Sequence, residues 1–404
     1  MFRALAHRDA LVLTLAAAAI LMIANGARLS LGLFVSPLNT ATGIGVVGIS
    51  FALAVGQFVW GLAQPFAGAI ADRHGPERVL VGGLVLVALG LAMTPFMDST
   101  FALTMSLGIL MAMGGGASSY SVLFGAVARR LPVEARGSAS GVINAGGSFG
   151  QFVFAPLVQR LMQSFGWMVA TWSLALMVLA AVPLVRWLRV PSAPAPAAAE
   201  QADRGVMAAV RESLRDRSYL LLHAGFFTCG VHIAFLVTHL PGEVALCGLP
   251  PTVASWSLAI IGLANIAGSL YAGHCVGVYR SKHVLAWMYA SRAVLVAAYL
   301  VAPRTAWTFY LFAAGLGFTW LATVPPTAAL VGKLFGVRYL STLFGLTLLS
   351  LQAGAVLGAW LGGVAVATFG DFTWMWYADM VLAALAALVN LPIREAPVLR
   401  AAAA

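Results

Sequence analysis

Long apolar runs follow one another along the whole chain, separated by short polar stretches. An apolar helix of about 20 residues crosses a hydrocarbon core of roughly 30 Å, so the pattern predicts membrane-spanning helices. The expected fold is an all-α membrane protein with twelve transmembrane helices in two six-helix halves. The runs lie at about 10–36, 44–70, 79–97, 101–128, 137–159, 166–185, 218–240, 251–276, 283–302, 306–331, 339–366 and 372–393.

The charge distribution sets the expected orientation. Hydrophobic residues make up 61% of the 404 residues and charged residues only 9%, whereas soluble domains carry about 25% charged residues. Most of the 23 Lys and Arg residues lie near the two ends of the chain or in loops after even-numbered runs, and Arg160 and Arg304 lie on the other side. The positive-inside rule then places both termini in the cytoplasm, in a cell inner (plasma) membrane. The net charge of +10 therefore does not indicate nucleic-acid binding.

The chain divides into two related parts. GAIADRHGPERVL at 68–80 recurs as GHCVGVYRSKHVL at 273–285, and glycines of the fifth run recur in the eleventh at nearly the same spacing. Repeated halves with a cavity between them are typical of secondary transporters. The expected division is an N-terminal half at 1–190, a cytoplasmic linker at 191–217 and a C-terminal half at 218–404.

The segment Gly68-Ala-Ile-Ala-Asp72-Arg73-His-Gly-Pro-Glu-Arg78 lies between the second and third runs. It resembles the loop 2–3 signature of the major facilitator superfamily. The resemblance implies alternating access between the two halves. It also implies that Gly68, Asp72, Arg73 and Arg78 form a latch that joins the cytoplasmic ends of the halves. In the second copy Gly277 replaces the aspartate, so a one-sided latch is expected.

Within that superfamily the chain is similar to the monocarboxylate transporter group, which includes the oxalate/formate antiporter and its bacterial relatives. The similarity rests on Asn25-Gly-Ala-Arg28-Leu-Ser-Leu-Gly-Leu-Phe34 in the first run, on HIAFLVTHLPG at 232–242 and on the segment 335–363. It implies that Arg28 contacts a substrate carboxylate. The group often has an Asp and an Arg in the eighth run, whereas this chain has Asn265-Ile-Ala-Gly-Ser269.

Arg28 and Arg292 stand inside long apolar runs. An arginine keeps its charge, and at the centre of a membrane helix it costs roughly 2.5–3.5 kcal/mol to insert. Such a residue faces an anionic ligand, a water-filled cavity or carbonyl groups of a neighbouring helix. The resemblance places Arg28 on the transport path. It places Arg292 on a peripheral helix, where a structural role is the alternative.

Polar and aromatic residues on single helix faces are further candidates for lining a cavity. In the second run Gln57, Trp60 and Gln64 share one helical face. Many such groups serve only to bridge helices. The candidate substrate-binding residues are Arg28, Gln57, Tyr120, Asn144, Gln151, His232, Asn265, Trp320 and Gln352.

Coupling to protons requires a group that titrates in the physiological range. His232 is the candidate proton site, because imidazole changes charge near neutral pH. A buried histidine also serves as a neutral hydrogen-bond bridge, and anion exchange or facilitated diffusion needs no such group. Asp379 is the only carboxylate expected well inside the runs, and its role is left open.

The predicted function is secondary active or facilitative transport of a small organic anion, a monocarboxylate. The alternative is an exporter of a hydrophobic or zwitterionic compound, such as a drug or siderophore. The family's drug/proton antiporters carry an arginine in the fourth run and a Gly-Pro pair in the fifth, and this chain has neither. No nucleophile–base pair or metal-ligand spacing indicates an enzyme or a metal site, and the three cysteines form no disulfide pattern. The expected partners are the organic anion and membrane lipid, without nucleic acid or cofactor, for a monomeric chain.

Overall fold

The computed structural model describes residues 8–189 and 205–396, and within these ranges every regular element is helical. A chain in a bilayer must satisfy its backbone polar groups internally, and a helix does so within one segment. The low-complexity part of the predicted linker, at 190–204, lies outside the described residues.

The N-terminal half contains the elements up to residue 188, of which four are short 3₁₀ or π segments that extend or interrupt longer helices. They are α1 (Arg8–Leu29), η2 (Ser30–Phe34), α2 (Val35–Thr42), α3 (Val46–His74), α4 (Pro76–Met93), η3 (Thr94–Phe96), α5 (Thr100–Leu103), η4 (Thr104–Met111), α6 (Ala112–Ala117), α7 (Tyr120–Arg130), α8 (Val133–Ala180) and η5 (Val182–Leu188).

The C-terminal half follows a short helix of the linker. The elements are α9 (Gly205–Ser213) in the linker, then α10 (Arg217–Leu246), α11 (Pro251–Val278), α12 (Ser281–Val301), α13 (Ala306–Thr319), η7 (Leu321–Thr323), α14 (Val324–Phe335), α15 (Leu340–Phe369) and α16 (Thr373–Asn390).

Eleven helical stretches of the described residues are long and apolar enough to cross a membrane. The expected fifth and sixth spans fall in one of them, Val133–Leu188. Inside that stretch Gly166 has φ 82° and ψ 166°, which lies outside the helical region. Only glycine adopts such a conformation readily, so Gly166 marks a sharp change of direction within the stretch.

Two spans are interrupted at matching places. The stretch that contains α6 and α7 breaks at Ser118 and Ser119, and the stretch that contains α13 and α14 breaks at Trp320–Thr323. Gly141 of the fifth run and Gly345 of the eleventh are equivalent glycines of the two halves. Ser119 and Thr323 are the same number of residues apart, so the two breaks lie at equivalent positions of the repeat. Pro325 and Pro326 follow the second break, and prolines in the first turn of α14 cannot donate the backbone hydrogen bonds that would continue α13. At the second break, backbone groups that lack a helical partner are bound by side chains of other helices.

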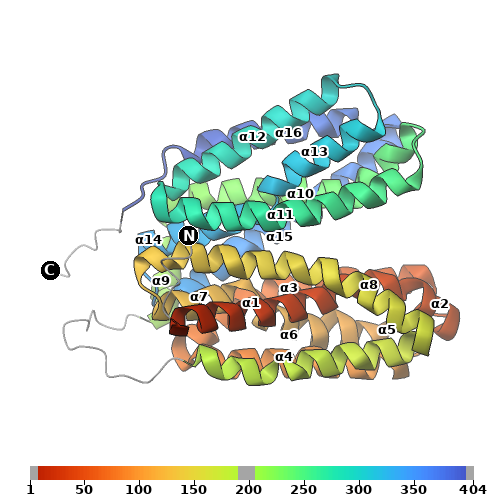
Figure 1. The fold of residues 1–404 in the computed structure, drawn as a ribbon, viewed down its shortest axis with the longest axis horizontal. Coiled ribbons are helices and arrows are strands. Elements are labelled where there is room, and N and C mark those ends of the chain that lie inside the picture. The colour runs from red at the N-terminus through yellow and green to blue at the C-terminus, as the bar shows by residue number, and fades with distance from the viewer. Residues whose placement is uncertain (1–7, 190–204, 397–404) are drawn as a thin grey trace.

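The two halves form separate bundles that lie alongside each other (Figure 1). Helices α3 and α8 of the first half pack against α15 and α11 of the second. Backbones approach closely at these crossings: a Cβ at Gly141 would lie 2.7 Å from the carbonyl oxygen of Ser269, and one at Gly345 would lie 2.8 Å from Cα of Pro65. Glycine is therefore required for this contact between the halves.

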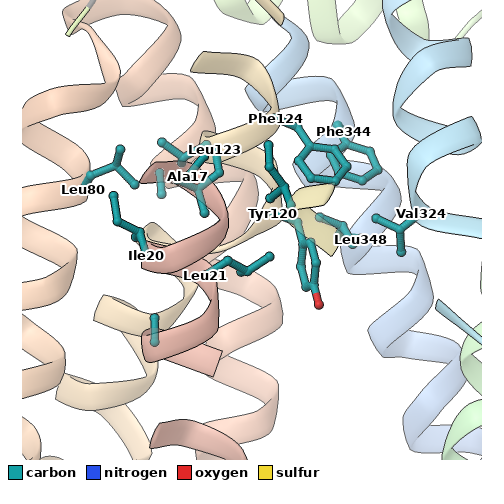
Figure 2. Close-up of a cluster of buried hydrophobic side chains, with 14 of the residues drawn as sticks. Ala17, Ile20, Leu21, Leu80, Tyr120, Leu123, Phe124, Val324, Phe344 and Leu348 are labelled. Atoms are coloured by element: carbon teal, nitrogen blue, oxygen red, sulfur yellow. The ribbon is translucent and has the colours of Figure 1, made fainter. Parts of the chain in front are cut away.

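An aromatic pair extends the hydrophobic core from one half into the other. Phe124 of α7 stacks on Phe344 of α15, with ring centroids 5.6 Å apart and an interplanar angle of 4° (Figure 2). The cluster continues through Ile20 and Leu21 of α1. Tyr120 is at its edge, with its hydroxyl directed away from the other labelled side chains (Figure 2).

Candidate functional site

Arg28 is held near the end of α1 by neutral groups. Its Nη1 donates to Oε1 of Gln57 at 2.8 Å, and its Nη2 donates to Oδ1 of Asn25 at 3.2 Å. The guanidinium carbon lies 4.3 Å from the ring centroid of Trp60, which gives a cation–π contact. These partners fix the position of the guanidinium without neutralising its charge.

Arg28 retains unused hydrogen-bonding capacity. Among the described residues no Asp or Glu forms an ion pair with it. Its Nε–H is buried without a partner, and each Nη keeps one further hydrogen. The residue lines a cavity of about 190 Å³ together with residues of α3 and α6, including Gln57 and Ala112. An unpaired guanidinium beside a cavity is suited to bind an anion.

Tyr120 and Gln352 lie close to this group. The hydroxyl of Tyr120 has no hydrogen-bond partner in the described structure and lies within electrostatic reach of Arg28. Nε2 of Gln352, on α15, donates to the backbone carbonyl of Gln57 at 3.3 Å. The predicted residues Arg28, Gln57, Tyr120 and Gln352 are therefore brought together from both halves of the molecule.

Asn144 and Asn265 form hydrogen bonds that join the two halves. Nδ2 of Asn144 on α8 donates to Oγ of Ser269 at 2.7 Å, and Nδ2 of Asn265 on α11 donates to Oγ of Ser148 at 2.5 Å. Each helix thus carries an Asn and a Ser four residues apart, and each Asn bonds the Ser of the other helix. We call these four residues the asparagine bridge.

The asparagine bridge also holds the break in the tenth span. Nδ2 of Asn144 donates to the carbonyl of Leu321 at 2.8 Å, and the Leu321 N–H donates to Oδ1 of Asn265 at 2.9 Å. Both backbone groups of one residue at the break are therefore bound by side chains of the bridge. The sequence analysis named both asparagines as substrate-binding candidates, with helix bridging as the alternative, and did not identify these partners.

Asp72, a residue of the predicted latch, contacts the other half of the molecule. Its Oδ2 accepts from the backbone N–H of Thr342 at 2.8 Å and from the Thr342 hydroxyl at 2.7 Å, at the start of α15. Its Oδ1 lies 3.0 Å from Nη2 of Arg129, and the Asp72 side chain is fully buried. A carboxylate at a helix N-terminus is favoured by free N–H groups and by the helix dipole. A Cβ at Gly68 would lie 2.4 Å from the carbonyl oxygen of Ser341, so this glycine permits the approach.

The basic partner of Asp72 is a residue that the sequence analysis did not single out. Arg129 is near the end of α7, and its Nη2 also reaches Oγ of Ser341 at 3.4 Å. The predicted partners Arg73 and Arg78 are exposed, and Arg78 lines an apolar groove between α3 and α4. The only sequence signal for Arg129 is the Arg-Arg pair at the end of the fourth run, which does not identify its partner.

Arg292 is a buried support for the broken tenth span. The residue is 0% exposed, and its Nη2 donates to the carbonyls of Thr319 and Trp320, where α13 ends. Its Nε donates to Oγ1 of Thr319 at 3.3 Å, and its Nη1 donates to Sγ of Cys229 at 3.2 Å. Cations are favoured at helix C-termini, where carbonyls lack intrahelical partners. The hydrogen bonds of Arg292 therefore go to the protein itself.

The remaining predicted residues are divided between the two halves. His232 lies in α10 beside Asp379 of α16, and its ring centroid is 6.1 Å from that of Trp320. Gln151 is exposed on α8. The sequence analysis expected Asp379 to be the only carboxylate well inside the spans, and the structure adds a buried carboxylate near the end of a span. Helix α10 continues to Leu246, past the predicted end at 240, and so includes the buried Glu243, which accepts from the Tyr299 hydroxyl at 2.6 Å.

A second and larger cavity lies at the latch end of the molecule. It has a volume of about 570 Å³ and is lined from both halves, by Arg136 and Ser140 of α8, Arg280, Lys333 of α14 and Glu395. The halves are therefore in contact through α3 and α15 at this end but diverge around α14.

Comparison with known proteins gives consistent matches over most of the chain. The sequence family described as the Major Facilitator Superfamily matches residues 14–246. Monocarboxylate transporter 13 of Rattus norvegicus is 25% identical over 85% of this chain and 80% of its own length. The oxalate:formate antiporter of Oxalobacter formigenes is 24% identical over 86% of this chain and 82% of its own. The fujikurins efflux protein of Gibberella fujikuroi is 24% identical over 76% of this chain and 64% of its own.

The fold also matches solved structures. FucP, a fucose:proton symporter of E. coli, matches in its outward conformation with a TM-score of 0.75 at 14% identity, over 95% of this chain and 99% of FucP. At this identity the similarity establishes the arrangement of helices only.

Proposed function

Because this chain belongs to the major facilitator superfamily, we propose that it moves a small organic anion, a monocarboxylate, across the membrane by alternating access. The observation that carries the proposal is Arg28, a guanidinium beside a cavity with no ion-pair partner among the described residues. Burying such a charge is costly unless an opposite charge or a polar cavity offsets it. A substrate carboxylate supplies that charge.

The geometry around Arg28 favours a carboxylate ligand. Gln57 and Asn25 fix the guanidinium plane, and the free Nε–H and Nη hydrogens can bind two carboxylate oxygens side by side. The unpartnered hydroxyl of Tyr120 is available as a further donor. Trp60 covers one face of the guanidinium, so the ligand approaches along its edge.

The size of the cavity favours a small anion. Its volume of about 190 Å³ is below the roughly 300–1,000 Å³ that is usual for drug-sized ligands. The relatives named for monocarboxylate and for oxalate:formate transport support the same class.

The alternative is export of a hydrophobic or zwitterionic compound. Two observations favour it: the eighth span has Asn265 and Ser269 where the monocarboxylate group often has charges, and one relative is named as an efflux protein. In this structure Asn265 bonds Ser148, and Ser269 accepts from Asn144, so the substituted residues serve the contact between the halves.

We further propose that the chain spans the membrane twelve times, with Gly166 separating the fifth and sixth spans, and that both termini are cytoplasmic. The halves 1–190 and 218–404 then rock about the central site, as a monomer in a cell inner membrane. Hydrogen bonds between the halves run from the centre, at Gln57 and Gln352, to the cytoplasmic end, at Asp72 and Thr342. The proposed state therefore faces outward, with the halves joined at the cytoplasmic end along α3 and α15 and separated around α14 by the cavity of about 570 Å³.

The proposed orientation can be tested on a native cysteine. Cys247 follows α10 in a loop assigned to the outside, whereas Cys229 and Cys275 are buried. A membrane-impermeant maleimide should label wild-type protein in intact cells, and Cys247→Ser should remove the label.

Burial and the nearby Glu243 carboxylate raise the pKa of the Cys247 thiol. Because the thiolate reacts, labelling should accelerate as pH rises through 8 to about 9. Labelling only after permeabilisation would reverse the assigned orientation.

The transported class can be tested on purified protein by ligand-induced thermal stabilisation. The probes are formate, oxalate, lactate and pyruvate, with two uncharged analogues, lactamide and pyruvamide, as matched controls. At 100 times the Kd a ligand stabilises by about 2.7 kcal/mol, so a saturating acid should raise Tm by several degrees and its amide should not. Stabilisation by hydrophobic cations or zwitterions, with none by the acids, would favour the exporter.

A further inference from the structure

A histidine and a carboxylate form a buried pair between α10 and α16. Nδ1 of His232 lies 2.6 Å from Oδ2 of Asp379, and each residue is 2% exposed. Isolated carboxylates are costly in apolar surroundings, and ionisable residues in membrane spans usually mark ion or proton pathways. The pair links a helix that lines the transport path in this family to one on the periphery.

The geometry leaves one atom of the pair able to take a proton. With Asp379 ionised, its carboxylate only accepts hydrogen bonds, so Nδ1 of His232 is the donor. Nε2 then carries the free lone pair, and it is buried without a partner in the described structure. A proton that binds Nε2 converts the imidazole to an imidazolium held by the carboxylate. The net charge of the pair changes from −1 to 0, and no covalent bond of a substrate is broken.

The charged groups around the pair are few. Arg292 and Tyr289 of α12 reach the same region, with Arg292 bonded to Cys229 one turn before His232. Further along α10, Glu243 is bonded to Tyr299. Helix α15 packs against α10 and has no titratable residue between Leu340 and Phe369. Arg292 brings one positive charge to this region through its bond to Cys229, and protonation of His232 adds another.

A continuous set of contacts leads from the pair to the interface of the halves. The ring of His232 lies beside that of Trp320, with centroids 6.1 Å apart and the planes tilted by 56°, and α13 ends at Trp320. The next residue, Leu321, is bound by Asn265 of its own half and by Asn144 of the other. An imidazolium attracts the face of an indole more strongly than a neutral imidazole does. Protonation can therefore shift the broken segment that holds the asparagine bridge.

We propose that His232 and Asp379 form the proton site of this transporter, and that one proton bound at Nε2 of His232 moves with each substrate anion. The proposal rests on the proposed transport of an organic anion. The proton comes from water on the more acidic side and leaves to water on the other side. Asp379 is a positioning residue: it orients the imidazole and stabilises its charged form.

The test uses purified full-length protein in liposomes that contain a pH-sensitive dye. Formate, oxalate, lactate and pyruvate are added one at a time, and protein-free liposomes correct for passive permeation. With wild type, a transported monoacid should carry protons inward, and its accumulation should rise about tenfold for each pH unit of inward gradient. His232→Gln and Asp379→Asn should both lose this dependence, and Asp379→Asn should retain thermal stabilisation by the acid.

His239→Gln is the matched control, because His239 lies on the same helix and bonds the carbonyl of Ala359 at 2.9 Å. It should behave as wild type. Acid uptake by wild type without proton movement would overturn the proton site and leave the transport proposal standing, whereas no acid movement at all would overturn both. A wild-type pH profile in His232→Gln would also overturn the assignment. If either variant fails to fold, the wild-type proton measurement still decides.

Discussion

Arg28→Ala should strongly reduce uptake of the organic acid and the thermal stabilisation that a fixed concentration of the acid gives. The guanidinium is the only charged group that lines its cavity among the described residues, and Gln57 and Asn25 cannot replace its charge. A hydrogen bond to a charged group contributes about 1.5–3 kcal/mol, so affinity should fall roughly ten- to a hundred-fold. Arg28→Lys should restore part of both signals, because the charge survives but the planar fork does not.

Arg292→Ala is the matched control for Arg28→Ala, since both remove an arginine from a membrane span. Arg292 donates to the carbonyls of Thr319 and Trp320, and removing it leaves buried acceptors unpaired, at about 1–3 kcal/mol each. Expression or melting temperature should therefore fall more than the affinity of the protein that remains folded. Thermal-shift titrations of both variants with the same acid provide the comparison. Wild-type affinity in Arg28→Ala would refute the anion contact and favour the exporter.

Asp72→Asn should leave expression and melting temperature close to wild type while lowering transport sharply. Asparagine can still accept from Thr342 but loses the ion pair with Arg129. Weakening this buried contact by about 2 kcal/mol would change the ratio of two conformations by roughly thirtyfold. The protein would then rest in a state other than the one described here. Transport assays in liposomes, with accessibility of the cytoplasmic end as the conformational readout, measure both effects.

Two controls separate the latch from a general effect of charge. Asp98→Asn removes an exposed carboxylate in the loop after the third span and should transport normally. If Asp72 and Arg129 act as a unit, the double variant Asp72→Asn with Arg129→Gln should be no worse than Asp72→Asn alone. Wild-type transport by Asp72→Asn would show that the latch has no role in this chain.

The membrane helices and the family could be predicted from the sequence because both depend on local order along the chain. Hydrophobic runs of sufficient length become helices in a bilayer whatever their neighbours. The segment from Gly68 to Arg78 indicated the superfamily, which the family match confirms. The run around Arg28 indicated the monocarboxylate group, and relatives named for monocarboxylate and oxalate:formate transport are similar to this chain. The sequence also predicted different roles for the two intramembrane arginines, because the resemblance places Arg28 on the transport path and Arg292 on a peripheral helix. The roles proposed for Arg28 and for the latch remain predictions.

The pairing of polar groups was decided only by the tertiary structure. Asp72 pairs with Arg129 instead of the neighbouring Arg73. Asn144 and Asn265 each form a hydrogen bond to a serine on the helix that carries the other. His232 contacts Asp379, which lies on a helix that the pattern placed on the periphery. Hydrophobicity can be read residue by residue, but a buried polar group must find its partner wherever helix packing brings one within about 3 Å. Those partners lie far apart in the chain. Their identity depends on helix rotation and on glycine crossings such as Gly68 with Ser341, which local sequence does not encode.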